Sequence, residues 1–151
     1  MPITAFNNTS MTVSDMDRSI EFYRDILGFS VVSDRIRDID FCEGLTGVDG
    51  AQMRIVHMDG PGIRIELMEY VKGAGGKIDT TTNNVGCMQV GFMVDDAHAM
   101  FEELKSKGVK IRSKRLVEIT EGPNQGGAIF FAEDPDGMVV KFMHLPGARE
   151  K

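Results

Sequence analysis

Apolar residues recur at helical spacing in a stretch near the N-terminus that organises our interpretation of the chain. The stripe has spacings of four, three and four positions and consists of Met16, Ile20, Tyr23 and Leu27. These spacings place the four side chains on one face of a helix. Ser14 and Asp15 can accept hydrogen bonds from the first helical turn, and Gly28 can adopt the left-handed conformation that ends a helix. The pattern therefore predicts a capped amphipathic helix.

The same pattern returns in the second half of the chain. Asp96 is the predicted N-terminal cap of a second helix, and Gly108 is the glycine predicted to end it. The apolar stripe between them consists of Ala97, Phe101 and Leu104. The two capping aspartates lie 81 positions apart and the two glycines 80 positions apart. A long period that occurs only twice indicates two fused modules rather than a solenoid.

Alternating polar and apolar positions around each helix predict strands. In the first half the predicted strands are residues 8–13, 30–34, 51–58 and 63–70, with a short helical turn or flap at 39–47. In the second half a helix at 97–107 is accompanied by predicted strands at 88–94, 109–112, 117–120, 128–133 and 138–144. We interpret each half as a β-α-β-β-β module, the second with one additional short strand.

These elements predict an α+β fold of two tandem βαβββ modules, residues 5–71 and 87–146, within a single domain of residues 1–151. Residues 72–86 are rich in Gly, Thr and Asn and are predicted to be a surface linker. A twisted four-stranded sheet with its helix on the outer face leaves the other face concave. We expect the two sheets to form an open half-barrel around a cleft.

Composition narrows the classes of partner. Lys and Arg number 17 against 23 Asp and Glu, a net charge of −6, which argues against nucleic acid because such binding depends on clustered cations. No apolar run is long enough to cross a bilayer, and the N-terminus lacks the pattern of a secretory leader, so we expect a cytoplasmic protein without membrane contact. Cys42 and Cys87 have no metal-ligand or disulfide-framework spacing.

Four motifs resemble the vicinal oxygen chelate superfamily, which includes glyoxalase I, bleomycin-resistance proteins and extradiol dioxygenases. They are Val13-x-Asp15, Ser19-x-x-Phe22-Tyr23-x-x-x-Leu27-Gly28-Phe29, Val94-x-Asp96 and Asp134-Pro135-Asp136-Gly137. The resemblance covers nearly the whole chain. It implies the glyoxalase-like fold and a homodimer, but the superfamily hosts isomerases, lyases, dioxygenases and inert drug binders on one scaffold.

Metal-dependent members of this superfamily place four ligands on the concave face. The resemblance maps them to Asn8 and Gln89, where the family usually has His, and to Glu66 and Lys141, where it usually has Glu. Glu66 alone matches the family. Amide oxygens and an ammonium make a poor site for a divalent cation, because imidazoles and carboxylates are the favourable ligands and the ammonium repels the cation. We therefore expect no cofactor and no metal ligands.

The first functional hypothesis is a metal-independent lyase or isomerase acting on a small organic molecule. Glu66 serves as the general acid or base, and Lys141 stands in place of the metal, either paired with Glu66 across the cleft or directed to solvent. Lys141, Arg64 or Gln89 would stabilise a developing oxyanion. The candidate binding residues are Asn8, Ser10, Arg64, Met68, Gln89, Met93, Met143, Phe41 and Phe130.

Two alternatives remain open. The first is a non-catalytic protein of the bleomycin-resistance kind that binds a drug or metabolite, with Met68, Met93, Met143, Phe41 and Phe130 lining its pocket. The second is a metal-dependent lyase of the glyoxalase I kind that tolerates the degenerate ligand set. His57, His98 and His144 could act as displaced ligands in that case. However, His57 and His98 are placed more simply at the surface, and His144 is expected to point opposite to Lys141 on its strand.

Overall fold

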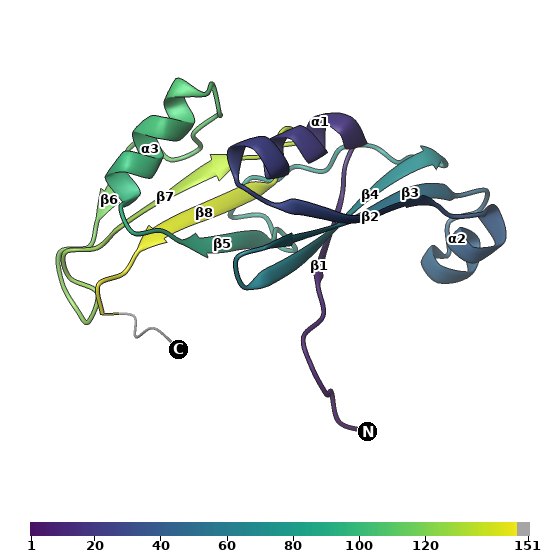
Figure 1. The fold of residues 1–151 in the computed structure, drawn as a ribbon, viewed down its shortest axis with the longest axis horizontal. Helices are drawn as coiled ribbons and strands as arrows, with labels where there is room; N and C mark the ends of the chain where they lie inside the picture. Colours follow the sequence, from purple (N-terminus) through teal and green to yellow (C-terminus); the bar gives the residue numbers. More distant parts are fainter. Residues whose placement is uncertain (148–151) are drawn as a thin grey trace. The chain divides into compact units, whose positions relative to one another are not determined.

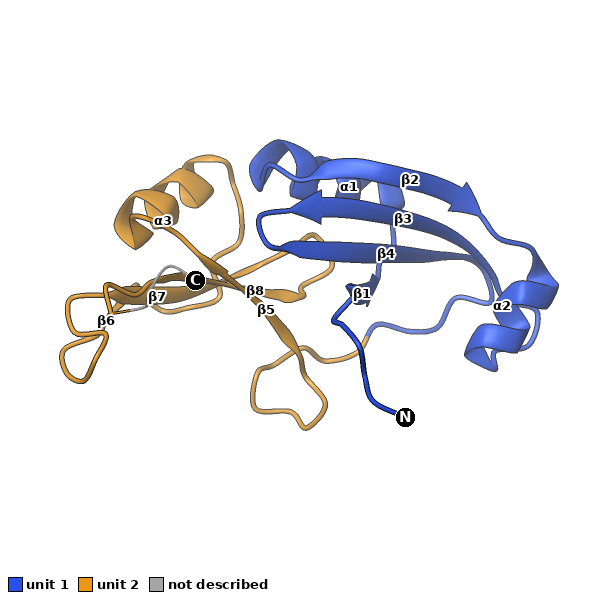
Figure 2. Ribbon diagram, turned by 60° about the horizontal axis from the view of Figure 1, so that its bottom comes forward, with its two compact units in different colours: residues 1–77 blue, residues 78–151 orange. Residues whose placement is uncertain are grey.

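The computed structural model describes residues 1–147, so the predicted domain end at residue 151 lies outside the described residues. The chain divides into two compact units, Met1–Lys77 and Ile78–Lys151 (Figure 2). The boundary falls inside the predicted linker at residues 72–86. Each unit contains one sheet and is described by itself.

Unit 1 contains a four-stranded sheet in the order β1-β4-β3-β2 (Figure 1). The strands are β1 (Thr9–Thr12), β2 (Ser30–Ile36), β3 (Gln52–Gly60) and β4 (Ile63–Lys72). β1 runs parallel to β4, and the other neighbours are antiparallel. The turn between β3 and β4 consists of Pro61 and Gly62, and Gly62 takes the positive φ of 71° that such a tight reversal requires.

The predicted first helix is present as α1 (Met16–Glu21), which passes into a π-helical turn, η1 (Phe22–Ile26). As predicted, Asp15 caps it by accepting a hydrogen bond from the Arg18 N–H. Gly28 follows with a φ of 77°. The buried stripe of α1 and η1 includes Met16, Ile20 and Tyr23.

One face of the sheet in unit 1 packs under α1, and the other face carries α2 (Ile39–Thr46) at one end (Figure 1). The α1 side contributes the buried side chains of Met11, Val56, Met58, Ile65 and Leu67. On the opposite face, α2 places its buried Cys42 in a small cluster with Ala51, Met53 and Ile55. This second face, which we call the open face, has polar side chains beyond the end covered by α2.

Unit 2 repeats this topology with the strand order β5-β8-β7-β6. Its elements are β5 (Gln89–Met93), α3 (Ala97–Ser106), β6 (Val117–Glu118), β7 (Ala128–Glu133) and β8 (Val139–His144). Asp96 caps α3 by accepting hydrogen bonds from the N–H groups of His98 and Ala99. β5 runs parallel to β8, as β1 does to β4. The α+β class and the internal duplication predicted from the sequence are therefore confirmed.

Two strand predictions in unit 2 need correction. Residues 109–112 make only an isolated bridge, between Ile111 and Ala132, because the neighbouring hydrogen bonds to β7 are irregular. Both the Arg112 and the Ser113 N–H groups donate to the Phe131 carbonyl, which breaks the regular ladder. The strand predicted at 117–120 is reduced to the two residues of β6.

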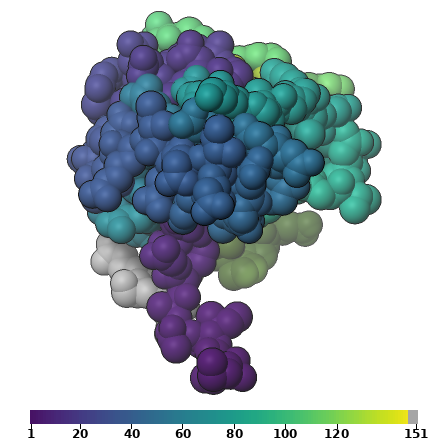
Figure 3. Space-filling view, turned by 90° about the vertical axis from the view of Figure 1, so that its right-hand side faces the viewer, coloured from purple at the N-terminus to yellow at the C-terminus, as the bar shows by residue number. Residues whose placement is uncertain are grey.

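Three further features follow from the described residues. No described helix is both long and apolar enough to span a membrane. Cys42 and Cys87 are free thiols, and Cys42 is fully buried as a small apolar residue. Residues 1–7 are exposed, and the N-terminal segment, purple in Figure 3, extends away from the body of unit 1.

Arg54 joins α1 to two strands of unit 1, and this cluster generates a prediction about stability. Its guanidinium donates to Asp17 at 2.8 Å and in a bidentate manner to Asp34 at 2.9 and 2.7 Å. The hydrogen bonds from Arg54 hold the pKa of the Asp34 carboxyl below its ordinary value. We expect Arg54→Met to lower the free energy of unfolding at pH 7 by on the order of 1 kcal/mol.

The pH dependence follows from the direction of this pKa shift. A depressed carboxyl pKa stabilises the fold above the ordinary value, and the contribution is lost as pH falls through the folded value. The difference between the parent protein and Arg54→Met should therefore shrink below about pH 4. Urea unfolding at pH 7 and pH 3 measures this difference in the free energy of unfolding. Exposed Arg115→Met is the matched control. A difference that is equal at both pH values would contradict the prediction.

Candidate functional site

Four polar side chains form one row across the open face of unit 1. Strand pairing places Ser10 beside Glu66, Glu66 beside His57, and His57 beside Ser33. Each of the four strands contributes one member, in the order β1, β4, β3 and β2. Because side chains alternate between the faces of a strand, the neighbours Ile65 and Leu67 point to the α1 side instead.

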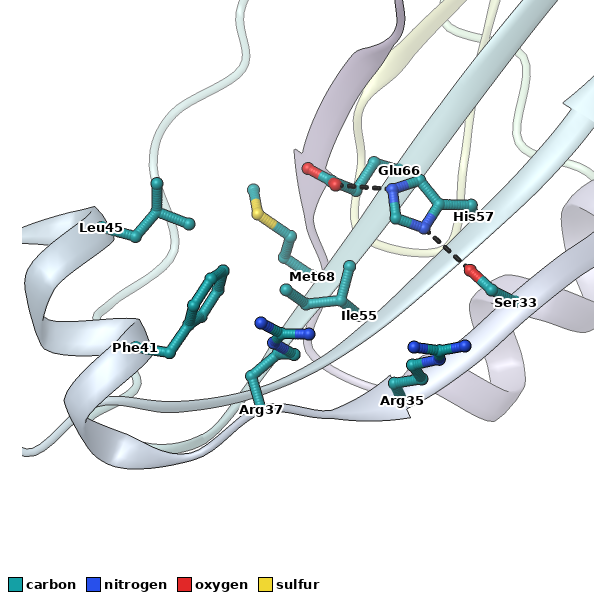
Figure 4. Close-up of a pocket in the computed structure, with 9 residues that line it drawn as sticks. All are labelled: Ser33, Arg35, Arg37, Phe41, Leu45, Ile55, His57, Glu66 and Met68. Atoms are coloured by element: carbon teal, nitrogen blue, oxygen red, sulfur yellow. Dashed lines mark hydrogen bonds and ion pairs between the residues drawn. The ribbon is translucent and has the colours of Figure 1, made fainter.

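Hydrogen bonds connect the row from end to end, and Figure 4 shows those that join Glu66, His57 and Ser33. The Ser10 hydroxyl donates to Glu66 Oε1 at 2.7 Å, and His57 Nε2 lies 2.8 Å from Glu66 Oε2. His57 Nδ1 lies 2.9 Å from Ser33 Oγ. With the imidazole proton on Nε2, His57 donates to Glu66 and accepts from the Ser33 hydroxyl. The carboxylate is thus oriented from both sides.

A pocket of about 350 Å³ opens at this row and extends toward α2. This volume lies in the range typical of small-molecule sites. Its lining residues are Ser33, Arg35, Arg37, Phe41, Leu45, Ile55, His57, Glu66 and Met68 (Figure 4). The polar row forms one end, Ile55 and Met68 form an apolar floor, and the α2 side chains form the other end. The Glu66 side chain is 20% exposed, so a bound molecule can reach it.

Local irregularity in β2 contributes to this geometry. The register between β2 and β3 shifts between Val31 and Ser33, which is a β-bulge. A bulge re-aims the side chains that follow it. After the bulge, Ser33, Arg35 and Arg37 recur at alternate positions and line one wall of the pocket.

The predicted site residues of unit 1 have different placements. Glu66, Met68 and Phe41 line the pocket, and Ser10 lies beside Glu66. The Arg64 guanidinium binds Asp59 at 2.6 and 2.9 Å near the β3–β4 turn. Arg64 is thus already paired, outside the pocket. Asn8 is half-buried just before β1 and also lies outside the pocket.

Most of the predicted site residues of unit 2 belong to the sheet face opposite α3. Gln89 and Met93 on β5 share this face with Lys141 and Met143 on β8. The Lys141 side chain lies over Gly91, where an added Cβ would come within 3.0 Å of its Cε. Lys141 is half-buried, and its ammonium has no carboxylate within ion-pair distance among the described residues of unit 2.

Phe130 requires a correction. Its ring packs edge-on against the ring of Phe101 in α3, with 5.1 Å between the ring centroids, and stacks on the ring of Phe142, with 5.3 Å between the centroids. Its side chain is 1% exposed, so Phe130 belongs to the core between α3 and the sheet. β7 is apolar on both faces, and its sequence therefore did not indicate which residues face the helix.

Sequence reasoning assigned His57 to the surface and did not identify Ser33, Arg35 or Arg37. A signal for His57 was present in the turn at Pro61 and Gly62. A two-residue turn pairs the residues on either side of it, and counting outward along the hairpin brings His57 opposite Glu66. No comparable signal exists for the two arginines, because charged residues on an edge strand are usually solvated.

Comparisons with known proteins agree with this architecture. A chain from Bacillus cereus described as a glyoxalase family protein superimposes with a TM-score of 0.80 at 18% identity, covering 96% of each chain. A protein from Actinomyces sp. named 2-epi-5-epi-valiolone epimerase is 26% identical over 147 residues, covering 94% of this chain and 80% of that protein. A lactoylglutathione lyase from Haemophilus influenzae is 27% identical over 139 residues, covering 90% of this chain and 89% of the relative.

The family profile gives the assignment directly. It matches residues 5–142, which include all the helices and all the strands except the last two residues of β8. The resemblance inferred from the motifs around Asp15, Asp96 and Asp134 is thereby confirmed. The chain belongs to the Glyoxalase/Bleomycin resistance protein/Dioxygenase superfamily.

Proposed function

We propose that this protein is a metal-independent lyase or isomerase that moves a proton next to the carbonyl group of a small organic molecule. The observation that carries the proposal is the position of Glu66. Its carboxylate is held by Ser10 and His57 at the end of a pocket large enough for a small ligand. A carboxylate oriented in this way is suited to general acid–base catalysis.

The relatives support the reaction class. Two that match over most of the chain carry the names 2-epi-5-epi-valiolone epimerase and lactoylglutathione lyase. Epimerisation of a carbon next to a carbonyl requires a base that removes its proton and an acid that returns one. Such chemistry needs an oriented base, a source of a proton for the opposite face of the carbon, and a way to stabilise the enolate.

The side chains do not fit a divalent metal. Both oxygens of Glu66 are already hydrogen-bonded, to Ser10 and to His57. Among the residues that the structure describes, no group of three or more His, Cys, Asp or Glu side chains could hold an ion. The other positions that the family resemblance maps to metal ligands supply two amides, Asn8 and Gln89, and the cationic Lys141. This donor set supports chemistry that depends on protein groups alone.

The proposed step begins with Glu66. Its carboxylate removes the proton from the carbon next to the substrate carbonyl, so that the C–H bond breaks and an O–H bond forms. The electron pair moves into the carbonyl and leaves a negative charge on its oxygen. Glu66 then returns the proton to the former carbonyl carbon of an enediolate, which isomerises the substrate, or water protonates the opposite face of the original carbon, which epimerises it. In a lyase the enolate instead expels a leaving group, which departs with the electron pair of its bond to carbon. His57 and Ser33 act as positioning residues, because they reach the carboxylate through hydrogen bonds.

We further propose that Lys141 stabilises the enolate oxygen. It occupies the position where the family resemblance places the second carboxylate ligand of the metal. A protein ammonium can provide electrostatic stabilisation at an oxygen that becomes negative. Within unit 2, Gly91 leaves space for this side chain on the face opposite α3.

Turnover by protein freed of metal tests the central proposal. Protein treated with a chelator is incubated in D2O with 2-epi-5-epi-valiolone, with lactoylglutathione and with a panel of small 2-oxo and 3-oxo acids. Mass spectrometry then detects deuterium incorporation or product formation. We expect activity without added metal and a loss in kcat of about 10²- to 10⁴-fold in Glu66→Gln. Glu69→Gln is the matched control, because this residue lies on the same strand and on the opposite face.

The outcomes are distinct. Full activity of Glu66→Gln, or activity that disappears with the chelator and returns with a transition metal, would contradict the proposal. Tight binding of a ligand that is never converted would instead identify a non-catalytic binding protein. The apolar floor of Ile55 and Met68 would then serve sequestration rather than catalysis.

The positioning role of His57 gives a separate prediction. Replacing it with Leu removes one hydrogen bond to Glu66 and the link to Ser33, so the carboxylate loses its fixed orientation. We expect kcat to fall by roughly 10- to 100-fold while KM changes less than about threefold, because misorientation affects the transition state most. Exposed His98→Leu is the control. A rise in KM with unchanged kcat would show that His57 only contacts the substrate.

Lys141→Met tests the proposed oxyanion role. Because no carboxylate of unit 2 pairs with this ammonium among the described residues, we expect the free energy of unfolding to change by less than about 0.5 kcal/mol. We expect kcat to fall by about 10²-fold, as for loss of one oxyanion donor. We would measure kcat and the free energy of unfolding of Lys141→Met and compare them with those of the exposed control variant Lys114→Met. Unchanged kcat would remove Lys141 from the mechanism.

A further inference from the structure

Two arginines in the pocket lack an acidic partner. Arg35 and Arg37 line it from the same wall, and no carboxylate of the described residues lies within ion-pair distance of either guanidinium. The nearby carboxylate of Asp38 is used as the cap of α2, where it accepts from the Phe41 N–H at 2.9 Å. Both cations therefore remain available to a bound molecule.

This arrangement contrasts with that of four other arginines in the described part of the chain. Carboxylates bind Arg24, Arg54, Arg64 and Arg112 at distances between 2.6 and 3.0 Å. The chain as a whole carries a net charge of −6, so acidic partners are abundant. Two unpaired guanidinium groups beside one another in one pocket indicate that the missing anion comes from the ligand.

Arg37 is also held in place before any ligand binds. Its guanidinium lies 3.9 Å from the centroid of the Phe41 ring, and its backbone N–H donates to the Met53 carbonyl at 2.8 Å. Stacking occupies the flat face of the guanidinium and leaves its edge N–H groups free to donate. In Figure 4, Arg37 lies near α2 and Arg35 lies closer to Ser33.

Strand register relates the two cations to the polar row. Arg35 is paired with Ile55, which in turn is paired with Met68, and this row is adjacent to the row that carries Glu66. Successive side chains on one face of a strand are about 7 Å apart. An anionic group at Arg35 therefore lies within the length of a small molecule from the Glu66 carboxylate, with Ile55 and Met68 as the surface between them.

We propose that Arg35 and Arg37 bind the anionic group, a carboxylate or a phosphate, of the small carbonyl compound that this pocket accepts. The apolar part of that compound lies on Ile55 and Met68, and its reacting carbon lies at Glu66. The position of the reacting carbon rests on the proposed function. Binding of the anion does not rest on the proposed function, because it depends only on Arg35 and Arg37.

Three unreactive probes test the anion site. They are 4-phenylbutanoate, 3-phenylpropyl phosphate and the neutral 4-phenylbutanamide, which share a phenyl group and a chain of similar length. Calorimetric titration at low ionic strength measures their affinity for the full chain. We expect one or both anions to bind at least tenfold more tightly than the amide. The order of the two anions distinguishes a carboxylate site from a phosphate site.

Substitutions assign the effect to the two arginines. Arg35→Met and Arg37→Met keep much of the side-chain length and remove the charge, so each should weaken anion binding about tenfold and leave amide binding unchanged. Arg37→Lys should retain part of the affinity, because the ammonium keeps the charge but cannot bind in a bidentate manner. Exposed Arg115→Met is the control and should leave all three affinities unchanged.

Amide binding as tight as that of the anions would overturn the proposal, and so would the absence of binding by all three probes at millimolar concentration. Equal weakening of all probes in the arginine variants would do the same, because it would show a packing effect. Glu66→Gln separates this inference from the proposed function. This variant should lower kcat by about 10²- to 10⁴-fold and bind the anions at least as tightly as the parent protein. Either conclusion can therefore fail while the other stands.

Discussion

The register of the β3–β4 hairpin is the constraint on which the rest of unit 1 depends. The turn at Pro61 and Gly62 pairs Gly60 with Ile63 and thereby places Glu66 opposite His57. A slip of one residue would move every side chain of a strand to the other face of the sheet. Ile65 would leave the core under α1, and Glu66 would be buried among apolar side chains without its partners. The same turn thus defines both the core and the polar row.

The two halves of the duplication have diverged around one shared topology. Both have a capped helix over one face and a parallel pair formed by the first and last strands. Unit 1 has long β2 and β3 strands with α2 between them, and α2 closes one end of the open face. In unit 2 the corresponding edge strand, β6, has only two residues. The pocket is therefore built from the half that has long strands and an additional helix.

The sequence was most informative where one side chain determines one local interaction. Asp15, Asp96 and Gly28 were identified from the sequence, because helix caps need particular residue types at fixed positions. His57 and Phe130 were misplaced, because their environments depend on strand register and on the choice of face. These are tertiary properties, and a strand that is apolar on both faces carries no periodic signal for them. The family resemblance located Glu66, but not the side chains that orient it.

Charge at the site acts over short distances in a chain that is acidic overall. At physiological ionic strength the Debye length is about 8 Å, so exposed carboxylates elsewhere on the surface are largely screened from the pocket. The fields of Arg35, Arg37 and Glu66 then dominate within it. An anionic group near Glu66 is repelled and one near the arginines is attracted, which leaves one orientation for a molecule with an anion at one end. The same charges that bind such a ligand therefore also direct its uncharged, reactive end to the base.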